Sequence, residues 1–465
     1  MTKADDAAVQ TAARALPLRG LAILPGDSAY DDARRVWNAM HDRRPAVIVR
    51  AAGTADVRTA LAFGQEHGLP IAVRAGGHNV AGNGTVEDGL VIDLGAMQGI
   101  RVDELSRTVR VEPGVTLGGL DRETQGFGLA VPVGVVSGTG LAGLALGGGV
   151  GWLTRAHGLT IDSLLAADVV TAAGEVVHAA PDQDAELLWG LKGGGGNFGV
   201  VTSMEFRAYP LGPQVLTGNF IYERSHWARA LEAFVAWTAD LPDALTSIVS
   251  FLIPPASFEL GSDVIMAIGF TWVDPDRSAA ERLTAALRTA APPDVEIVEP
   301  TDWLAWQSAV DEIFPKGSRA YWKNASLSGL PSGAIAAIVE HAPRVVALGS
   351  GFDIHHMGGA VRRVADDATA FPNRTAPYWV NMYGVWQDAA DDERGRAWAR
   401  DFHAALAPYA DAGMYVNFLG AEAGADARQQ ALAAYGPAKL ERLTALKRRL
   451  DPGNVFRLNH NIPPD

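Results

Sequence analysis

The chain has 465 residues, a net charge of −14 at pH 7 and no cysteine. At about 150 residues per domain, this length accommodates two or three domains. The absence of cysteine excludes disulfides, thiolate metal sites, iron–sulfur clusters and cysteine nucleophiles, so redox chemistry would need a cofactor held by other groups. The acidic balance, without a cluster of Lys or Arg, argues against nucleic acid as a partner.

The N-terminal segment from Met1 to Leu18 carries Lys3, Asp5, Asp6 and Arg14 and has no uninterrupted apolar core. We therefore expect a cytoplasmic protein and no signal peptide. The stretch from Thr124 to Thr154 has no charged residue and could be mistaken for a membrane span. Its many glycines would make a poor lipid-exposed helix, so no membrane partner is expected.

The first 210 residues are predicted to alternate strands with helices. Short apolar runs bounded by Gly or Pro predict the strands, and apolar residues at helical spacing predict the helices. The predicted strands cover 45–50, 70–74, 89–94, 100–102, 108–111, 163–171, 175–179 and 200–206, and the predicted helices begin near 54 and 185. This pattern is typical of an α/β or α+β domain.

The composition changes near Tyr209–Pro213, where two prolines mark a boundary. Beyond it we predict a second α+β domain, an antiparallel sheet with helices on one face. Its predicted strands cover 215–221, 246–253, 263–272, 350–364 and 377–386, and its predicted helices cover 225–239, 276–290 and 331–342. A basic amphipathic helix is expected at 437–450, before Asp451-Pro452-Gly453.

One match to a familiar motif is interpreted as a coincidence. Residues 138–143 fit the dinucleotide fingerprint G-x-G-x-x-G, and Asp162 lies near the distance expected of a ribose ligand. The fingerprint needs a helix after its last glycine, and the glycines at 147, 148, 149 and 151 make that helix costly. An NAD-dependent dehydrogenase is therefore kept only as an alternative.

A metal site is not expected either. His355 and His356 are adjacent, so in a strand their side chains point to opposite faces and would not bind one ion together.

Glycine is abundant, with 51 residues against a usual frequency of about 7%. Three clusters stand out, at 75–77, 138–151 and 193–199. Consecutive glycines expose backbone N–H groups that can approach a diphosphate and a flat ring closely. The clusters therefore favour one large, partly anionic ligand that is contacted from several loops.

The motifs around these clusters resemble a known superfamily. Arg74-Ala-Gly-Gly-His78, residues 134–149, Gly158-Leu-Thr-Ile-Asp162 and residues 192–199 resemble, in this order, the FAD domain of the vanillyl-alcohol oxidase / p-cresol methylhydroxylase (PCMH) superfamily. Tyr415-Val-Asn417 and residues 454–462 are similar to the C-terminal segment of berberine bridge enzyme-like oxidases. The match extends over nearly the whole chain.

The resemblance implies an α+β protein with a bipartite PCMH-type FAD-binding domain and an α+β substrate domain built on an antiparallel sheet. The FAD domain would cover 1–208, with subdomains at about 40–103 and 104–208. The substrate domain would cover 209–412, and the segment 413–465 would return to the FAD domain.

The resemblance also implies FAD as the cofactor, bound covalently through the flavin 8α-methyl group to His78. The loop 74–79 would hold the diphosphate. The other residues expected at the cofactor are Arg74, Ala75, Gly76, Gly77, Asn79, Gly82, Val136, Ser137, Thr139, Gly140, Gly143, Gly147, Gly148, Gly149, Gly151, Trp152, Asp162, Gly199, Val200, Val201, Tyr415, Asn417 and Asn459.

The chain departs from the family pattern at informative positions. Val136 stands where many relatives form a second flavin link through cysteine, so a single link is expected. Thr139 is small at the position that admits or blocks oxygen, which favours an oxidase over a dehydrogenase. Phe418 and Arg363 replace the tyrosine and the glutamate that relatives use as catalytic bases.

Another residue must then take the proton from the substrate. His355 is the first candidate, because it lies on a predicted strand and an imidazole titrates near neutral pH. Tyr383 is the second. Seven aromatic residues are candidates for a substrate pocket: Trp303, Trp306, Tyr321, Trp322, Trp379, Tyr383 and Trp386.

The expected reaction passes a hydride from a small phenolic, polyketide or alkaloid-like molecule to flavin N5, with reoxidation by O2. Two alternatives stay open. One is a carbohydrate oxidase that acts on a hemiacetal, and the other is a flavin-fold protein that binds or cyclises its ligand without net oxidation.

Overall fold

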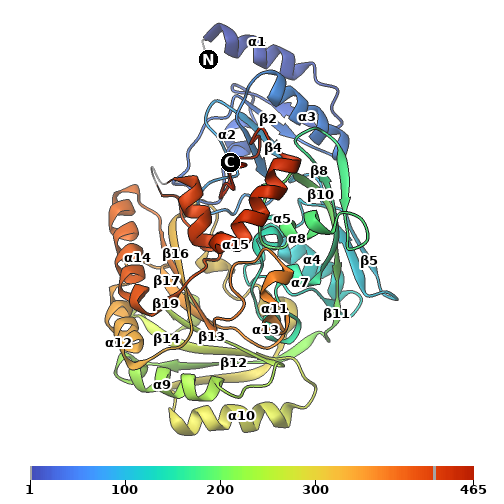
Figure 1. Ribbon diagram of the computed structural model, residues 1–465. Coiled ribbons are helices and arrows are strands. Elements are labelled where there is room, and N and C mark those ends of the chain that lie inside the picture. The colour runs from blue at the N-terminus through green and yellow to red at the C-terminus, as the bar shows by residue number, and fades with distance from the viewer. Residues whose placement is uncertain (1–2, 423–425) are drawn as a thin grey trace.

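The computed structural model describes residues 3–422 and 426–465, which form three main sheets covered by helices (Figure 1). The chain builds these sheets one after another, in the ranges 21–93, 100–207 and 214–411. The limit expected at 208/209 falls between β10 and β11, and the limit expected at 412/413 follows β19.

The first sheet has the order β1-β2-β4-β3, with β2, β4 and β3 parallel and β1 antiparallel to β2. Its strands are β1 (Leu21–Ile23), β2 (Val47–Arg50), β3 (Ile71–Arg74) and β4 (Leu90–Asp93); the nearby helices are α1 (Lys3–Arg14), α2 (Tyr30–Ala33) and α3 (Thr54–Glu66). Strands β2 and β4 are buried on both faces, as expected of continuous apolar runs in a parallel arrangement. At their carboxyl edge, β3 and β4 end on Arg74 and Asp93, where such sheets bind ligands.

The second sheet is antiparallel, with the order β5-β6-β10-β8-β9. Its strands are β5 (Ile100–Asp103), β6 (Thr108–Val111), β8 (Leu164–Val170), β9 (Val176–Ala179) and β10 (Val200–Arg207). The helices of this region are α4 (Leu117–Gln125), α5 (Leu141–Gly147), α6 (Thr154–His157), α7 (Thr160–Ser163) and α8 (Ala185–Leu191), and β7 (Leu129–Ala130) pairs with β11 (Tyr209–Pro210).

Helix α5 corrects one expectation. The glycines after residue 143 were expected to prevent a helix here, but α5 runs from Leu141 to Gly147. It is stabilised because Leu141 and Ala145 are fully buried in the core of this region, and tertiary packing overrides local propensity. Gly148, with φ of 144°, ends it. Within residues 3–422 and 426–465, no helix combines the length and the apolar composition needed to cross a bilayer.

The third sheet has eight antiparallel strands in the order β15-β12-β14-β13-β17-β18-β16-β19. They are β12 (Gln214–Tyr222), β13 (Leu245–Leu252), β14 (Ile265–Trp272), β15 (Val295–Asp302), β16 (Arg319–Leu327), β17 (Gly351–His356), β18 (Tyr378–Trp386) and β19 (Ala410–Asp411). Strands β17 and β18 lie near the centre of the sheet. On one face of these strands, Trp379 packs with Val150 and Tyr383 packs with Trp37 and Val80, which belong to the regions of the first two sheets.

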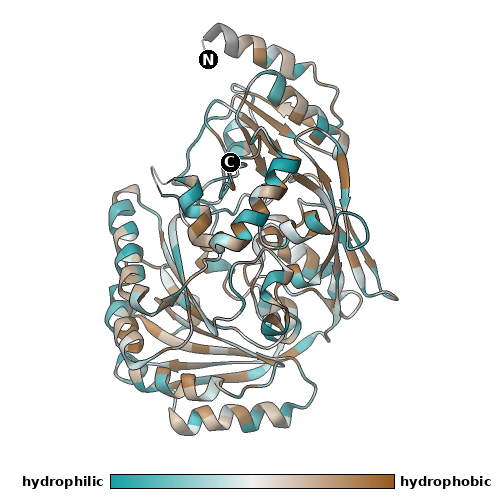
Figure 2. Cartoon of the chain, viewed as in Figure 1, coloured by the Kyte–Doolittle hydropathy of each residue, from teal (hydrophilic) through white to brown (hydrophobic). Residues whose placement is uncertain are grey.

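Helices cover the opposite face of this sheet, as predicted. They are α9 (Trp227–Thr238), α10 (Arg277–Ala290), α12 (Ser332–His341) and α14 (Asp392–Leu406). Apolar side chains such as Phe234, Leu287, Ile338 and Phe402 bury the helices against the strands. In Figure 2 these helices alternate hydrophobic and hydrophilic residues along their length, as amphipathic helices do.

Several features of this part differ from the sequence prediction. Strands β15 and β16 and helix α14 were not anticipated. Strand β17 ends at His356 and not near residue 364, because Gly358 and Gly359 take left-handed φ values of 107° and 54° before α13 (Ala360–Arg363). Helix α11 (Trp303–Gln307) and short 3-10 turns at 224–226, 256–258, 311–313, 342–344, 366–368, 389–391, 407–409 and 416–418 complete the region.

The C-terminal segment returns to the first two sheets (Figure 1). Helix α15 (Ala427–Leu450) breaks at Gly436, where φ is 70°, so its second half begins at Pro437 as predicted. Lys447 near its end is fully buried, pairs with Asp451 at 2.7 Å and also donates to the carbonyls of Asn197 and Phe456. These contacts hold residues 451–462 against the second sheet.

Candidate active site

A cavity of about 300 Å³ lies where the carboxyl edge of the first sheet meets the second sheet and the C-terminal segment. Fifteen of the residues expected at a cofactor line it: Arg74, Ala75, Gly76, Gly77, His78, Asn79, Val136, Thr139, Gly140, Gly143, Gly199, Val201, Tyr415, Asn417 and Asn459. Segments distant in sequence therefore meet around one space, as the three glycine clusters indicated.

The loop that follows β3 presents free backbone donors to this cavity. In the described part of the chain, the N–H groups of Gly76, Gly77, His78 and Asn79 donate to no other group. Gly77 takes a left-handed φ of 69°, a conformation that glycine adopts without strain. Successive unpaired N–H groups in such a loop form an anion-binding nest, which fits the diphosphate of a dinucleotide.

Two of the glycine loops touch each other directly. A Cβ atom on Gly76 would lie 2.5 Å from the Cα of Gly140, and a Cβ on Gly140 would lie 2.5 Å from the nitrogen of Gly76. Real Cβ atoms do not approach backbone so closely, so both positions need glycine. The contact sets the width of the cavity between the loop 74–79 and the start of α5.

Four buried polar atoms in the lining have no partner among the described residues. They are Nη1 of Arg74, Nε1 of Trp322, Oδ1 of Asn459 and Nε2 of His460. Buried polar atoms are nearly always hydrogen-bonded in native proteins, so these four fit a polar ligand. The guanidinium of Arg74 is fixed by its other nitrogen, because Nη2 donates to the carbonyl of Ala33 and to Asp93.

His78 lies at the end of the loop, against the indole of Trp37. The two ring centroids are 4.8 Å apart and the planes are 20° from parallel. Burial lowers the pKa of His78 to about 4, so the imidazole is neutral at physiological pH. His78 also lines a second, polar cavity of about 520 Å³ on the other side of the loop.

The C-terminal segment is fixed by hydrogen bonds to the region around α5. The hydroxyl of Tyr415 accepts from the N–H of Gly149 at 2.8 Å and from Nδ2 of Asn417 at 2.9 Å. A Cβ on Gly147 would lie 2.3 Å from Oδ1 of Asn417. Gly147 and Gly149 therefore lie outside the lining but hold the residues that form it.

Aromatic side chains form the wall toward the third sheet. Trp322 of β16 and Phe418 both line the cavity, with ring centroids 5.8 Å apart. Nδ2 of Asn324 donates to the carbonyls of Tyr415 and Phe418, which places Phe418 against this wall. Of the seven aromatic residues proposed from the sequence, Trp322 lines the cavity.

The two candidate bases lie directly behind this wall and not in the lining. The ring of Tyr383 is 6.2 Å from that of Trp322, and the ring of His355 is 6.2 Å from that of Phe418. Burial lowers the pKa of His355 to about 4. Whether either residue acts as a base stays a prediction.

Tyr383 has a partner that the sequence analysis did not select. Its hydroxyl donates to Oδ1 of Asp353 at 3.2 Å. Burial raises the pKa of Asp353 to about 6, and burial together with the Asp353 carboxylate raises the pKa of Tyr383 well above its usual value of 10. Asp353 remains partly exposed, whereas Tyr383 and His355 are buried. Next to Asp353 in the sheet, Asn381 has a buried Oδ1 with no partner among the described residues.

Several residues expected at the cofactor lie elsewhere. Asp162 forms a buried ion pair with Arg374 at 2.7 Å and accepts from the N–H of Leu159. Ser137 donates its N–H to Asp311 and lines the second cavity. Gly82, Gly148, Gly151, Trp152 and Val200 pack against protein atoms outside the lining.

Some lining residues were not selected from the sequence. They are chiefly Gly194, Gly195, Gly196, Asn197, Tyr435, Phe456, Leu458 and His460. The signal for most of them was present, because residues 194–197 belong to the third glycine cluster and residues 456–460 to the C-terminal motif.

A metal centre is not formed by the residues that the structure describes. No group of three or more His, Asp or Glu side chains among them is arranged to hold an ion. His355 faces Phe418, whereas His356 lies 3.3 Å from Nη1 of Arg155 and beside Tyr378 on the other face of β17.

Comparisons with known proteins agree with this geometry. A family model described as an FAD binding domain matches residues 45–180, and one described as berberine and berberine like matches residues 414–463. The chain is 31% identical to an FAD-linked oxidoreductase of Dictyostelium discoideum, over 96% of this chain and 95% of that protein. It is 32% identical to (R)-6-hydroxynicotine oxidase of Paenarthrobacter nicotinovorans, over 97% and 98%.

Solved structures show the same likeness. The 6-hydroxy-D-nicotine oxidase from Arthrobacter nicotinovorans aligns with a TM-score of 0.84 and 28% identity, covering 97% of this chain and 99% of that one. BBE-like 1 of Physcomitrella patens aligns with a TM-score of 0.86 and 22% identity over 99% of both chains, which is a likeness of fold.

Proposed function

The chain belongs to the berberine bridge enzyme-like family of FAD-linked oxidoreductases, and on this premise we propose that it oxidises a small phenolic, polyketide or alkaloid-like compound with O2 as electron acceptor. The observation that carries the substrate class is the aromatic wall formed by Trp322 and Phe418. Flat aromatic molecules stack on such side chains. The named activity of the Paenarthrobacter relative, on a hydroxynicotine, supports the same class.

The residues that would hold FAD are those lining the cavity of about 300 Å³. The unpaired N–H groups of residues 76–79 suit the diphosphate, and Asn459 and His460 offer unpaired polar atoms to the rest of the cofactor. His78 would carry a single covalent link, since Val136 has no sulfur for a second. The chemistry that FAD supplies when bound is acceptance of a hydride and transfer of two electrons to O2.

We assign the removal of the substrate's proton to Tyr383 and Asp353. Because the Tyr383 hydroxyl already donates to Asp353, its oxygen can accept a proton from the substrate while its own proton passes to the carboxylate. The partial exposure of Asp353, and the Oδ1 of Asn381 that has no partner among the described residues, make this part of the sheet polar enough to suit a substrate group. His355 is the second candidate, because a group with a pKa of about 4 is a weak base.

One further feature supports an oxidase, and another argues against a sugar substrate. Thr139 lines the cavity with a small side chain, which leaves space for O2 beside the cofactor. Phe418 brings no hydroxyl to the cavity, which disfavours the sugar oxidation expected of relatives with a tyrosine at this position.

The proposal is tested by mixing the purified holoenzyme anaerobically with two panels of compounds. One panel contains phenols and hydroxylated N-heterocycles, and the other contains oligosaccharides with a free hemiacetal. We expect the first panel to bleach the flavin absorption, and admission of O2 to restore it with release of hydrogen peroxide. Bleaching by the sugars alone would make the protein a carbohydrate oxidase, and bleaching by neither panel would contradict the substrate class proposed here.

A further inference from the structure

We propose that Trp37 is the positioning residue for attachment of FAD to His78, because its indole fixes the plane of the imidazole that forms the bond. The inference rests on the covalent link proposed above. Trp37 precedes the predicted FAD subdomain in sequence, and it contacts the reactive loop only in the folded protein.

The stacking contact is close and the indole is itself held. The ring centroids of Trp37 and His78 are 4.8 Å apart, at an interplanar angle of 20°. Nε1 of Trp37 donates to the carbonyl of Phe314 at 3.0 Å, and its backbone N–H donates to the carbonyl of Gly77 at 2.9 Å. Trp37 is 3% exposed. The indole therefore has one orientation relative to the loop that carries His78.

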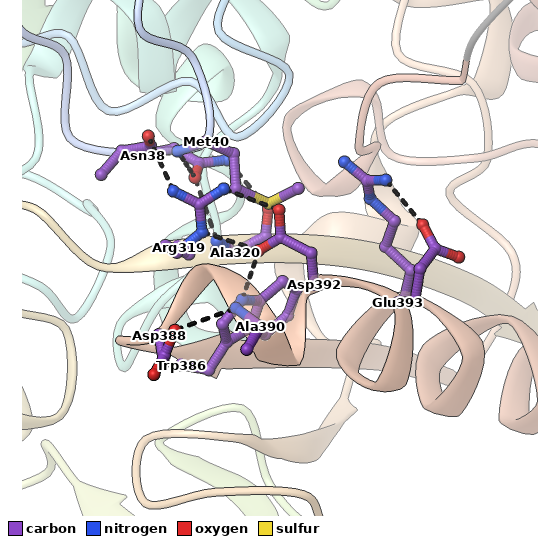
Figure 3. A network of polar contacts seen from close by, with 11 residues as sticks. Asn38, Met40, Arg319, Ala320, Trp386, Asp388, Ala390, Asp392 and Glu393 are labelled. Carbon is purple, nitrogen blue, oxygen red and sulfur yellow. Dashed lines mark hydrogen bonds and ion pairs between the residues drawn. The ribbon is translucent and has the colours of Figure 1, made fainter.

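Asn38, which follows Trp37, forms hydrogen bonds with two other parts of the chain. Nδ2 of Asn38 donates to the carbonyl of Val80 at 2.7 Å and to that of Ala320 at 2.8 Å, and its Oδ1 accepts from the N–H of Ala320 at 3.0 Å. Figure 3 shows Asn38 beside Ala320, with Arg319 paired to Asp392 next to them. Residues 37–38 therefore connect β16 to Val80, directly after the loop 74–79.

In residues 3–422 and 426–465, the imidazole has no hydrogen bond that would fix its plane. Among the described residues, neither ring nitrogen of His78 has a hydrogen-bond partner. His78 lines both the cofactor cavity and the second cavity, so the ring has space on either side of the loop. The stack on Trp37 is therefore the contact that sets the direction of the nitrogen lone pair.

The attachment step has a simple balance. A bond forms between an imidazole nitrogen of His78 and the 8α carbon of the flavin, and one 8α C–H bond and the imidazole N–H bond break. The two protons and two electrons released reduce one O2 to hydrogen peroxide, so the flavin ends in its oxidised form. The imidazole proton can leave through the second cavity, which is lined by Asp32, Asp93 and Asp311.

The indole also favours this step electrostatically. As the nitrogen forms its new bond, positive charge develops on the imidazole before the proton leaves. A cation over the face of a tryptophan is stabilised by the ring quadrupole. Trp37 thus acts on the reaction through His78, by orientation and by charge, without touching the reacting carbon.

A pair of substitutions separates stacking from hydrogen bonding. Trp37→Phe and Trp37→Leu both lose the bond from Nε1 to Phe314, but only Phe keeps a flat ring over His78. Each holoprotein is precipitated with acid, and the flavin that stays in the pellet is measured against total flavin per chain. We expect the parent and Trp37→Phe to keep their flavin in the pellet. Attachment in Trp37→Leu should be at least about tenfold slower, with FAD still bound but extractable.

Trp237→Leu is the control, because Trp237 is half-buried, donates Nε1 to the carbonyl of Leu283 and lies away from the loop. It should attach flavin as the parent does. If Trp37→Leu purifies without flavin, Trp37→Met, which fills more space without a flat ring, takes its place with the same expectation.

The outcomes are distinct. Attachment in Trp37→Leu or Trp37→Met at the parental rate overturns the role of Trp37, and so does equal impairment of the Phe variant, because the ring plane would then not matter. A parent protein that releases all its flavin into acid overturns the covalent link itself, and this result is visible without any variant.

Discussion

The hydroxyl of Tyr383 on β18 donates a hydrogen bond to Oδ1 of Asp353 on the neighbouring strand β17, at 3.2 Å. The ring of Tyr383 lies 6.2 Å from that of Trp322, which lines the cavity proposed for FAD. The pair joins a phenol that stays protonated to a carboxyl group that changes its charge near pH 6. That combination can take up one proton at a defined pH.

The first prediction concerns the pH profile of oxidation. Asp353 accepts the proton only when ionised, and burial raises its pKa to about 6, so kcat/KM should rise with pH through about 6 and level off above it. Asp353→Asn should remove this rise and lower kcat by at least about 100-fold. Steady-state rates between pH 5 and 8 check both points. A rise that disappears in His355→Ala but persists in Asp353→Asn would move the role to His355.

The second prediction concerns the contact between the two glycine loops. A methyl group at residue 140 would lie 2.5 Å from the nitrogen of Gly76, so Gly140→Ala should push the loops apart. Overpacking of this kind costs about 1–3 kcal/mol, which corresponds to roughly 5- to 150-fold weaker FAD binding. Flavin content per chain and titration with added FAD measure the loss. Gly138→Ala is the matched control, since nothing lies within 4 Å of its added Cβ; equal losses in both variants would contradict the prediction.

The third prediction concerns the buried pair Lys447 and Asp451. Lys447→Met leaves the carboxylate of Asp451 buried without its cation, which should lower the free energy of unfolding by about 3–5 kcal/mol. Chemical denaturation of the purified protein measures this change. Arg344→Ala breaks an exposed pair with Glu340 at the same i,i+4 spacing and should cost no more than about 0.5 kcal/mol. Similar losses in the two variants would show that burial does not set the strength of these pairs.

The fourth prediction concerns Asp121, which is 1% exposed on α4 and accepts a hydrogen bond from Nε2 of Gln307. Burial raises its pKa to about 7, so between pH 4 and 7 the folded chain binds a proton that the unfolded chain has lost. This group therefore removes stability as pH rises across that window, by at most about 4 kcal/mol. The melting temperature of Asp121→Asn minus that of the parent should therefore increase from pH 5 to pH 8. A difference between the two proteins that does not change with pH would refute the shift.

Fifteen of the residues that the sequence indicated for the cofactor line one cavity, because their signals are local. Glycines with left-handed φ, such as Gly77, and glycines with no room for a Cβ, such as Gly76 and Gly140, leave a visible pattern in the chain. The large sheet was predicted incompletely. Strand β15 is an exposed edge strand with several acidic residues and a proline, so it shows no alternation of apolar and polar residues.

The substrate side of the site could not be predicted to the same extent, because it depends on pairing between distant segments. Asp353 meets Tyr383 only through the register of β17 against β18, and Trp37 meets His78 across about 40 residues of sequence. Helix α5 also shows that local sequence signals can be overridden by packing. Its glycines predict a loop, and the burial of Leu141 and Ala145 makes it a helix.

One side of the cavity is lined by residues from the end of the chain: Phe456, Leu458, Asn459 and His460. These residues are made about 380 positions after the loop that carries His78, which takes a ribosome roughly 20–80 s at about 5–20 residues per second. In the later part of that interval, once residue 199 has been made, the glycine loops are complete in sequence but open on one side. The cavity proposed for FAD is therefore completed late in the synthesis of a new chain, by a segment that lies outside the first two sheets.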